Sequence, residues 1–242
     1  MEAIRIENIT KIYKDVIAVD HLSLRIEQGE LLSVLGVNGA GKTTLIKMLS
    51  CLTSPTEGDA FLLGKSIKTQ SAQIKKSIAV SPQESALAPN LSVYENLELM
   101  YGIYGYDKEE KKEKIAKVAS LLGLDEVLKR KAGKLSGGWK RRLSIAMALI
   151  AEPRILFLDE PTLGLDVLAR SDLWDIIRTL KGKITVILTT HYMEEAEQLS
   201  DRVAILKNGK LLCCDTPDAI KQRSGTDSFE KAFIHVVKGA QI

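Results

Sequence analysis

Apolar and polar residues alternate along two parts of the first 27 residues, IRIE at 4–7 and LSLRIE at 22–27. A period of two is typical of strands buried on one face, so we expect antiparallel strands here. Residues 31–35 form instead a compact, mostly apolar run. Such a run is typical of a strand that is covered on both faces.

Helical periodicity replaces the strand pattern between residues 89 and 151. Strand-like runs return at 154–158 and 184–189, and two more flank Asn208-Gly209, a dipeptide that favours a two-residue hairpin turn. Strands and helices in this order predict an α/β fold with a mainly parallel sheet.

We therefore expect a single domain over residues 1–242. Within it, residues 1–88 and 152–242 would form an α/β core that includes an N-terminal antiparallel β subdomain. Residues 89–151 would form an inserted α-helical subdomain.

The composition is that of an ordinary globular protein, which excludes a disordered chain. It is 45% hydrophobic and 27% charged, and 34 Lys and Arg face 31 Asp and Glu. The densest charged cluster, at 108–117, mixes both signs and predicts a solvated helix face rather than a nucleic-acid patch. Three cysteines, none in a C-x-x-C pair, predict neither a disulfide framework nor a structural zinc site.

No window contains the roughly 18 nearly uncharged apolar residues that a membrane span needs. The first residues, MEAIRIENITKIYK, also lack the apolar stretch of a signal peptide. These two observations predict a cytoplasmic chain.

Residues 36–44 read GVNGAGKTT and match the phosphate-loop pattern G-x-x-x-x-G-K-[ST]. The glycines let backbone N–H groups turn inward around a polyanion, and the helix that follows adds the positive end of its dipole. We expect Lys42 on the β- and γ-phosphates and the Thr43 hydroxyl on Mg²⁺. The predicted phosphate-binding residues are Gly36, Val37, Asn38, Gly39, Ala40, Gly41, Lys42, Thr43 and Thr44.

An apolar strand that ends in two carboxylates, ILFLDE at 155–160, predicts the second half of a nucleotide site. The carboxyl edge of a parallel sheet delivers such side chains to the ligand crevice. We expect Asp159 to hold Mg²⁺ and Glu160 to polarise an attacking water. His191 ends the next core strand at the same edge, where its imidazole would face the γ-phosphate, although a lone histidine is more often a polar strand end. The predicted catalytic residues are Lys42, Glu160 and His191.

A third motif, Leu135-Ser136-Gly137-Gly138, precedes the helical segment 139–151. A serine and glycine-rich backbone at a helix N-terminus suit an anion, although such an entry alone is more often a simple cap. With GVNGAGKTT before it and ILFLDE after it, the chain resembles the ATP-binding subunit of ABC transporters, whose signature motif is LSGG. The resemblance covers nearly the whole chain and implies a RecA-like P-loop NTPase core, with ATP and Mg²⁺ as ligands.

The resemblance also implies roles for residues outside the three motifs. Tyr13 matches an aromatic that stacks on adenine, and Gln83, in VSPQES, matches a loop glutamine that reaches Mg²⁺. Asp166, in TLGLD, matches a loop that crosses between subunits. The resemblance further implies that Ser136, Gly137 and Gly138, which match the signature motif, bind the ATP of the facing subunit. Trp139 departs from the family, which most often has Gln there, and indole has one donor and no acceptor.

The function implied by the resemblance is ATP hydrolysis that powers transport through separate multi-span membrane subunits. A second ATP-binding subunit would pair with this one head to tail, on the cytoplasmic face of the membrane, and no nucleic-acid partner is expected. Segments 94–105 and 228–239 are most like the ATPases of type-two exporters for drugs, sodium or lipid-linked polysaccharide.

Two other functions are weighed against this one. A soluble ABC-type ATPase could act as a nucleic-acid or ribosome-linked switch, but such relatives usually carry two cassettes or long insertions. A metabolic P-loop kinase is the second alternative, and the LSGG motif and His191 argue against it.

Overall fold

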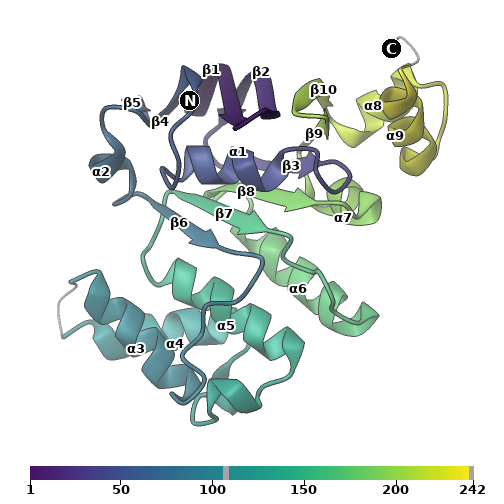
Figure 1. Ribbon diagram of the computed structural model, residues 1–242. Helices are drawn as coiled ribbons and strands as arrows, with labels where there is room; N and C mark the ends of the chain where they lie inside the picture. The colour runs from purple at the N-terminus through teal and green to yellow at the C-terminus, as the bar shows by residue number, and fades with distance from the viewer. Residues whose placement is uncertain (106–108, 240–242) are drawn as a thin grey trace.

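A six-stranded, mainly parallel sheet forms the centre of the computed structural model, which describes residues 1–105 and 109–239 (Figure 1). The strand order is β10-β9-β3-β8-β7-β6, and every neighbouring pair is parallel except β10 with β9. This confirms the predicted α/β class and the hairpin at Asn208-Gly209. The strands are β3 (Leu31–Leu35), β6 (Ile78–Ser81), β7 (Ile155–Asp159), β8 (Thr185–Thr190), β9 (Arg202–Lys207) and β10 (Lys210–Asp215).

The alternating N-terminal segments form a second, antiparallel sheet, as predicted. Its strand order is β2-β1-β4-β5, so β1 pairs with both β2 and β4. In the register, Ile4 lies opposite Ile26 and Ile6 lies opposite Leu24, and these side chains are buried. The strands are β1 (Glu2–Tyr13), β2 (Val16–Glu27), β4 (Glu57–Leu62) and β5 (Lys65–Ser66).

Helices cover both faces of the six-stranded sheet, and α1 lies between the two sheets (Figure 1). The helices are α1 (Lys42–Leu49), α2 (Ser71–Ile74), α3 (Val93–Ile103), α4 (Lys111–Leu121), α5 (Gly137–Leu149), α6 (Val167–Leu180), α7 (Met193–Leu199), α8 (Pro217–Arg223) and α9 (Phe229–Lys238). Short 3₁₀ turns are η1 (Asp125–Val127) and η2 (Ala132–Lys134).

Strand β7 is buried on both faces because an apolar cluster lies on each side of it. Leu156 and Leu158 pack into the cluster that contains residues of α5 and α6, whereas Ile155 and Phe157 pack with α1. All four side chains are 0% exposed. The continuous apolar run before Asp159 therefore reflects two-sided burial, and it fixes the strand that ends in the predicted site.

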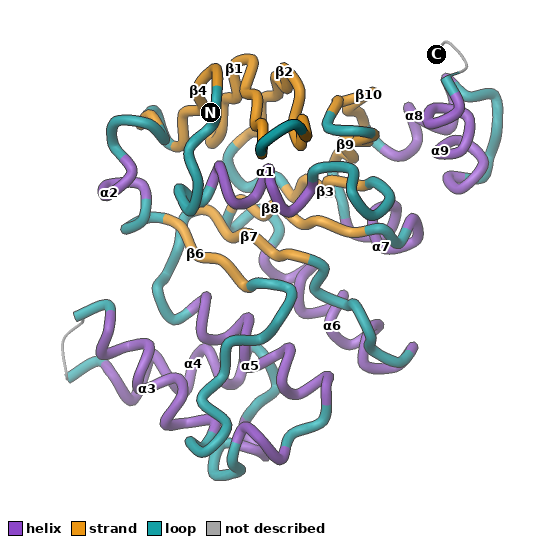
Figure 2. Tube along the Cα trace, viewed as in Figure 1, coloured by secondary structure: helices purple, strands orange, loops and turns teal. Residues whose placement is uncertain are grey.

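The helical pattern of 89–151 corresponds to α3, α4 and α5, which gather on one side of the sheet (Figure 2). Leu97 and Tyr101 of α3, Ile115 of α4 and Leu143 of α5 are buried in one cluster together with Leu156 of β7. The helices thus pack on each other and on the sheet. The limits of a subdomain at 89 and 151 stay a prediction.

The mixed charges at 108–117 fall mainly on α4, except that Lys108 lies outside the described residues. The Lys114 ammonium lies 3.2 Å from a Glu110 carboxylate oxygen and 3.1 Å from one of Glu152. Lys111 pairs in the same way with Glu98. Lys111 and Lys114 are therefore paired with carboxylates of the same chain.

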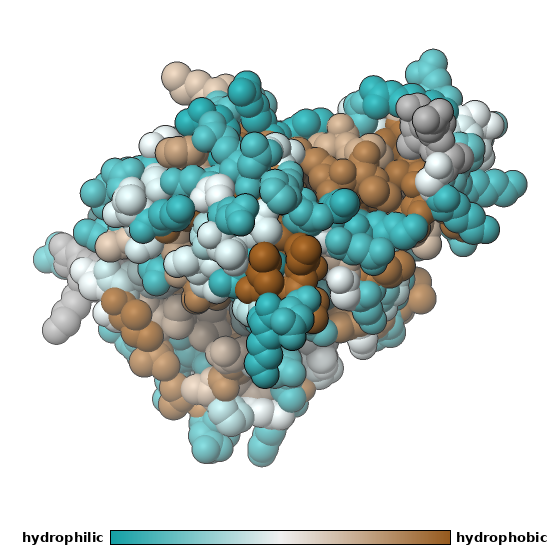
Figure 3. Space-filling model, turned by 45° about the horizontal axis from the view of Figure 1, so that its top comes forward, coloured by the Kyte–Doolittle hydropathy of each residue, from teal (hydrophilic) through white to brown (hydrophobic). Residues whose placement is uncertain are grey.

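Among residues 1–105 and 109–239, no helix combines the length and apolar character that crossing a bilayer requires. The surface seen in Figure 3 is largely hydrophilic, and its apolar side chains gather in separate patches. Two of the most exposed apolar residues are Val167 and Leu168, at 76% and 78%, where α6 begins.

Asn96 on α3 fixes the loop that leads into the helices. Its side chain is 0% exposed, and its Oδ1 accepts a hydrogen bond from the Ala88 amide at 2.9 Å. Its Nδ2 donates to the carbonyl oxygens of Ala88 and Ser92 at 3.1 and 2.9 Å. The buried Asn96 side chain therefore supplies hydrogen-bond partners to backbone groups of a loop that has no regular secondary structure.

We predict that Asn96→Ala lowers the free energy of unfolding by about 2 kcal/mol, because it removes the side-chain partners of half-buried backbone groups in this loop. Urea unfolding followed by circular dichroism measures the change. Asn90→Ala is the control, since Asn90 is exposed on the same loop and its truncation should cost less than about 0.5 kcal/mol. Equal losses in the two variants would contradict the assignment.

Candidate functional site

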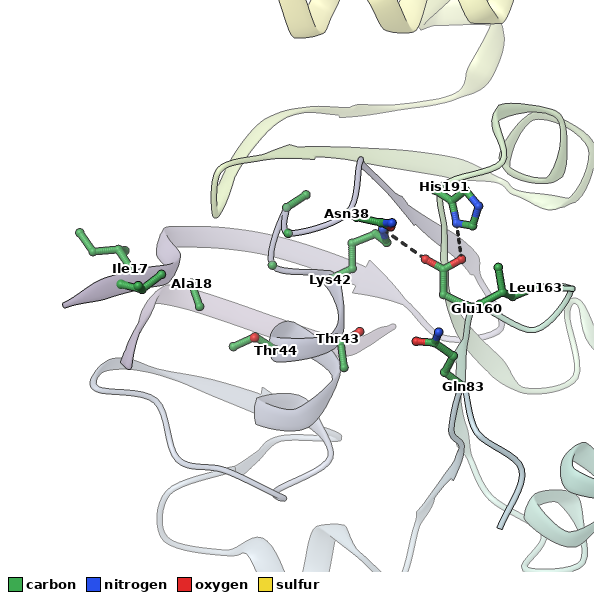
Figure 4. A pocket seen from close by; sticks show the side chains of 14 residues that line it. Ile17, Ala18, Asn38, Lys42, Thr43, Thr44, Gln83, Glu160, Leu163 and His191 are labelled. Carbon is green, nitrogen blue, oxygen red and sulfur yellow. Dashed lines mark hydrogen bonds and ion pairs between the residues drawn. The ribbon is translucent and has the colours of Figure 1, made fainter. Parts of the chain in front are cut away.

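A cavity of about 550 Å³ opens where the phosphate-loop motif meets the carboxyl edge of the six-stranded sheet (Figure 4). It brings together residues from five separate parts of the chain. The lining residues are Val16, Ile17, Ala18, Asn38, Gly39, Ala40, Gly41, Lys42, Thr43, Thr44, Gln83, Glu160, Leu163 and His191. Most of the predicted phosphate-binding residues and two carboxyl-edge residues, Glu160 and His191, thus share one cavity.

The phosphate loop connects β3 to α1 in a conformation that only glycine tolerates at key positions. Gly41 has φ +102°, and a Cβ there would lie 2.3 Å from the Ala18 carbonyl oxygen. A Cβ on Gly36 would lie 2.6 Å from the Leu206 carbonyl oxygen. Helix α1 begins at Lys42 with Gly41 as its N-cap, so its first N–H groups are open to an anion.

The Glu160 carboxylate lies between two nitrogen donors. One oxygen is 3.2 Å from the Lys42 ammonium, and the other is 2.7 Å from Nδ1 of His191 (Figure 4). Lys42 and Glu160 are only 6% and 7% exposed. Because both charges are buried, each depends on the other for compensation.

Lys42 also donates to the backbone of its own loop. Its ammonium bonds the Gly36 carbonyl oxygen at 2.7 Å and lies 3.4 Å from that of Val37. Gly36 and Val37 therefore reach the site through their backbone, although neither is among the cavity-lining residues. The charge of Lys42 is held at the centre of the loop.

Asp159 lies at the end of β7 and next to the loop. Its Oδ1 accepts a hydrogen bond from the Thr189 hydroxyl and lies 3.4 Å from the Thr43 hydroxyl. Gln83 adds an amide oxygen, and Figure 4 shows its side chain beside Glu160. Carboxylate, hydroxyl and amide oxygens are the ligands that Mg²⁺ prefers, so this donor set fits a magnesium ion.

Other predicted site residues lie outside the cavity of this chain. Ser136 is the N-cap of α5, and both it and Gly137 are exposed, while Gly138 is half-buried in the first turn of the helix. Asp166 is the N-cap of α6 and accepts a hydrogen bond from the Ala169 amide at 2.9 Å. The Trp139 ring faces the Arg142 guanidinium, with 5.1 Å to the ring centroid.

Tyr13 ends β1 and is 43% exposed. It pairs with Val16 across the hairpin, and the ammonium of Lys11 lies 5.1 Å from its ring centroid. The cavity wall on this side consists of Val16, Ile17 and Ala18. An aliphatic wall therefore stands next to the predicted stacking residue, a feature that the sequence motifs do not show.

Two buried residues that sequence analysis missed hold the segment around Glu160. The Arg141 guanidinium donates to backbone carbonyls on either side of Glu160, and burial lowers the pKa of Arg141 to about 10. Glu195 on α7 is 0% exposed and accepts a hydrogen bond from the Thr162 hydroxyl at 2.8 Å, and burial raises the pKa of its carboxyl.

One signal in the sequence could have found Arg141. Arg141 precedes Ser144 by three residues and Ala148 by seven, so in a helix it lies on the same face as these two residues, which are buried. A charged residue at such a position needs internal partners. Glu195 has a weaker signal, since Glu194 and Glu195 are adjacent and only the structure shows which one is buried.

Comparison with known proteins agrees with this arrangement. The profile of the family described as "ABC transporter" matches residues 19–163. Human phospholipid-transporting ATPase ABCA3 is 39% identical over 226 residues, which are 92% of this chain and 13% of ABCA3. The probable multidrug ABC transporter ATP-binding protein YbhF of Escherichia coli (strain K12) is 38% identical over 240 residues, 97% of this chain and 41% of YbhF. The chain thus spans a minor part of both relatives.

Solved structures share most or nearly all of the architecture. An "ATP binding subunit of ABC transporter" superposes with a TM-score of 0.85 at 26% identity, over 97% of this chain and 99% of that one. The ATP-binding cassette MJ0796, solved as a dimer bound to ADP and Pi, superposes with a TM-score of 0.80 at 27% identity, over 88% of this chain and 98% of that one. The chain therefore belongs to the ABC transporter family, and it has the fold of that family's ATPase cassette.

Proposed function

We propose that this chain binds ATP in the cavity and hydrolyses it to drive transport through a membrane-spanning partner. The observation that carries the proposal is the position of Glu160, a buried carboxylate at the mouth of a phosphate loop, between Lys42 and His191. A carboxylate placed there can accept a proton from a water molecule that attacks the γ-phosphate.

The phosphate loop would bind the triphosphate. N–H groups at the start of α1 would surround the β-phosphate, and the Lys42 ammonium, now paired with Glu160, would turn to the β- and γ-phosphates. Glu160 would then be free to accept a hydrogen bond from water. His191, 2.7 Å from Glu160, would hold the carboxylate and face the γ-phosphate.

The Mg²⁺ that accompanies ATP would be held by Thr43, Asp159 and Gln83, the oxygen donors described above. When bound, it neutralises charge on the phosphate oxygens. Thr189 fixes the Asp159 carboxylate through its hydroxyl, so this oxygen keeps its direction toward Thr43.

The adenine base would lie against the hairpin that contains Tyr13, Val16 and Ile17. The aliphatic side chains of Val16 and Ile17 line the cavity there, and Tyr13 lies opposite Val16 on the neighbouring strand. Apolar contact and stacking suit the flat face of a base.

We further propose that two copies pair head to tail. Ser136 and Gly137 are exposed at the start of α5 and lie outside the chain's own cavity, so the γ-phosphate that they suit would belong to a second copy. The cassette MJ0796 is dimeric in its structure with ADP and Pi. Since ADP lacks the γ-phosphate, hydrolysis would remove a contact between the copies and loosen the pair.

The membrane partner would dock near the loop from Gln83 to Tyr94 and the helices within 89–151, which we propose form a subdomain. A chain working in this way would lie on the cytoplasmic face of the membrane.

ABCA3 is named as a phospholipid transporter and YbhF as a probable multidrug transporter. These names support a transporter rather than a nucleic-acid switch, and we propose that this chain powers export of an amphipathic compound.

We predict that Glu160→Gln keeps ATP affinity and lowers the hydrolysis rate by about 100-fold or more, because an amide cannot accept the proton of the attacking water. Phosphate release measures the rate. Size-exclusion chromatography with Mg²⁺ and ATP should show a trapped dimer. Glu113→Gln, at an exposed position on α4, is the control and should hydrolyse ATP as the wild type does. A normal rate in Glu160→Gln would overturn the proposed chemistry.

We also predict that Lys42→Ala raises the Kd for ATP by about 10- to 100-fold, because it removes charge-assisted hydrogen bonds to the phosphates. Titration calorimetry measures the affinity. The matched variant is Lys47→Ala, since Lys47 is exposed on the same helix, α1. The loop would not be the phosphate site if both variants bound ATP as the wild type does.

A further inference from the structure

Glu160 has a backbone conformation that residues with a side chain rarely adopt. Its φ is +48°, in the left-handed region, and the next residue is Pro161. A Cβ makes this region unfavourable, and such residues persist only where their surroundings hold them. The direction of the Glu160 carboxylate therefore depends on whatever fixes this turn.

Strand β8 holds the turn at the amide of Glu160. This N–H lies 3.1 Å from the carbonyl oxygen of Thr189 and 3.1 Å from its hydroxyl oxygen. Thr189 is 0% exposed. One side of the peptide is thus anchored in the sheet, but this contact does not set the orientation of the peptide that follows Glu160.

Glu195 and Thr162 anchor the far end of the turn. The Thr162 hydroxyl donates to Oε1 of Glu195 at 2.8 Å, and Nε1 of Trp174 donates to the same oxygen at 3.0 Å. Both Thr162 and Glu195 are 0% exposed. Helices α6 and α7 therefore fix the position two residues after Glu160.

Arg141 bonds the two peptide groups that flank the Glu160–Pro161 peptide. Its NH2 donates to the Asp159 carbonyl oxygen at 2.8 Å and its Nε donates to the Pro161 carbonyl oxygen at 2.8 Å. These carbonyls belong to the residues immediately before and after Glu160. Its NH1 donates to the Pro82 carbonyl oxygen, next to Gln83. Among side chains, only the planar guanidinium has several N–H donors in one plane with fixed directions, so it can reach all three carbonyls.

We propose that Arg141 is a positioning residue for hydrolysis: by holding the carbonyls of Asp159 and Pro161 it maintains the left-handed backbone of Glu160 and the direction of its carboxylate. The inference rests on the proposed function of the site. Arg141 lies on α5, five residues after Ser136. The helix that presents Ser136 to a second copy is thereby bonded to the Glu160 turn and to the Gln83 loop of its own chain.

The first test compares Arg141→Met with wild type. A methionine of similar length keeps the packing but donates to none of the three carbonyls. We expect kcat for ATP hydrolysis to fall by about 10- to 100-fold, as small misplacements of a catalytic group do, while the Kd for ATP changes less than about twofold. Arg141→Lys, which keeps a charged donor, should recover part of the loss.

The matched control is Arg142→Met. Arg142 is the next residue on α5, but its guanidinium bonds Asp172 at 2.8 Å instead of the Glu160 turn. Its loss should leave kcat and Kd close to the wild-type values. A fall in kcat as large as that of Arg141→Met would show that any arginine loss on α5 has this effect, which would overturn the proposal.

A double-mutant cycle with Glu160→Gln tests whether Arg141 acts through Glu160 or by a general effect on the fold. The rate losses from two residues that act as a unit do not add. Single-turnover hydrolysis in Glu160→Gln should not fall further when Arg141→Met is added. Additive losses, or a normal kcat in Arg141→Met alone, would overturn the role of Arg141. An unaffected rate in Glu160→Gln alone would instead refute the proposed function.

Folding is checked by circular dichroism and by the melting temperature. If Arg141→Met does not fold, the same cycle is run with Arg141→Lys, which keeps a positive charge in the buried site. The expected result is the same in direction: a lower kcat, an unchanged Kd, and no further loss in the Glu160→Gln background. A normal kcat or additive losses in Arg141→Lys would overturn the proposal.

Discussion

The ion pair between Lys42 and Glu160, with His191 on the second carboxylate oxygen, is the interaction on which the site depends. Strand order brings these three residues together. β3, β8 and β7 are neighbours and parallel, so their carboxyl ends lie at one edge. Lys42 follows β3, Glu160 follows β7 and His191 follows β8. A different strand order would separate the charges and leave each one buried without a partner.

Two apolar clusters give this edge its rigidity. The side chains of β7 point alternately into the cluster with α1 and into the cluster with α5 and α6. A shift of one residue in the pairing of β7 with its neighbours would therefore move each side chain to the opposite face of the sheet. The same helices supply the polar supports: α1 begins at Lys42, and α5 carries Arg141. Packing and site geometry are therefore fixed by the same elements.

The sequence predicts the parts of the site that are local in the chain. The phosphate loop is one contiguous motif, and Asp159 and Glu160 directly follow an apolar strand, so their place at the sheet edge follows from fold class. The contacts of Arg141 are with residues 82, 159 and 161, at least 18 positions away. No local pattern encodes such partners. The aliphatic wall of Val16 and Ile17 depends likewise on how the antiparallel sheet packs against the loop.

Unfavourable features are concentrated at one edge of the sheet. Glu160 has a left-handed backbone, Lys42 and Glu160 are charged and nearly buried, and Arg141 is 5% exposed. Each of these costs free energy by itself. They persist because the supports are shared: one guanidinium bonds three carbonyls and fixes the turn, and one carboxylate pairs with Lys42 and also contacts the imidazole of His191. An arrangement in which every member needs its neighbours is held in one geometry, which is what a site acting on a single phosphate bond requires.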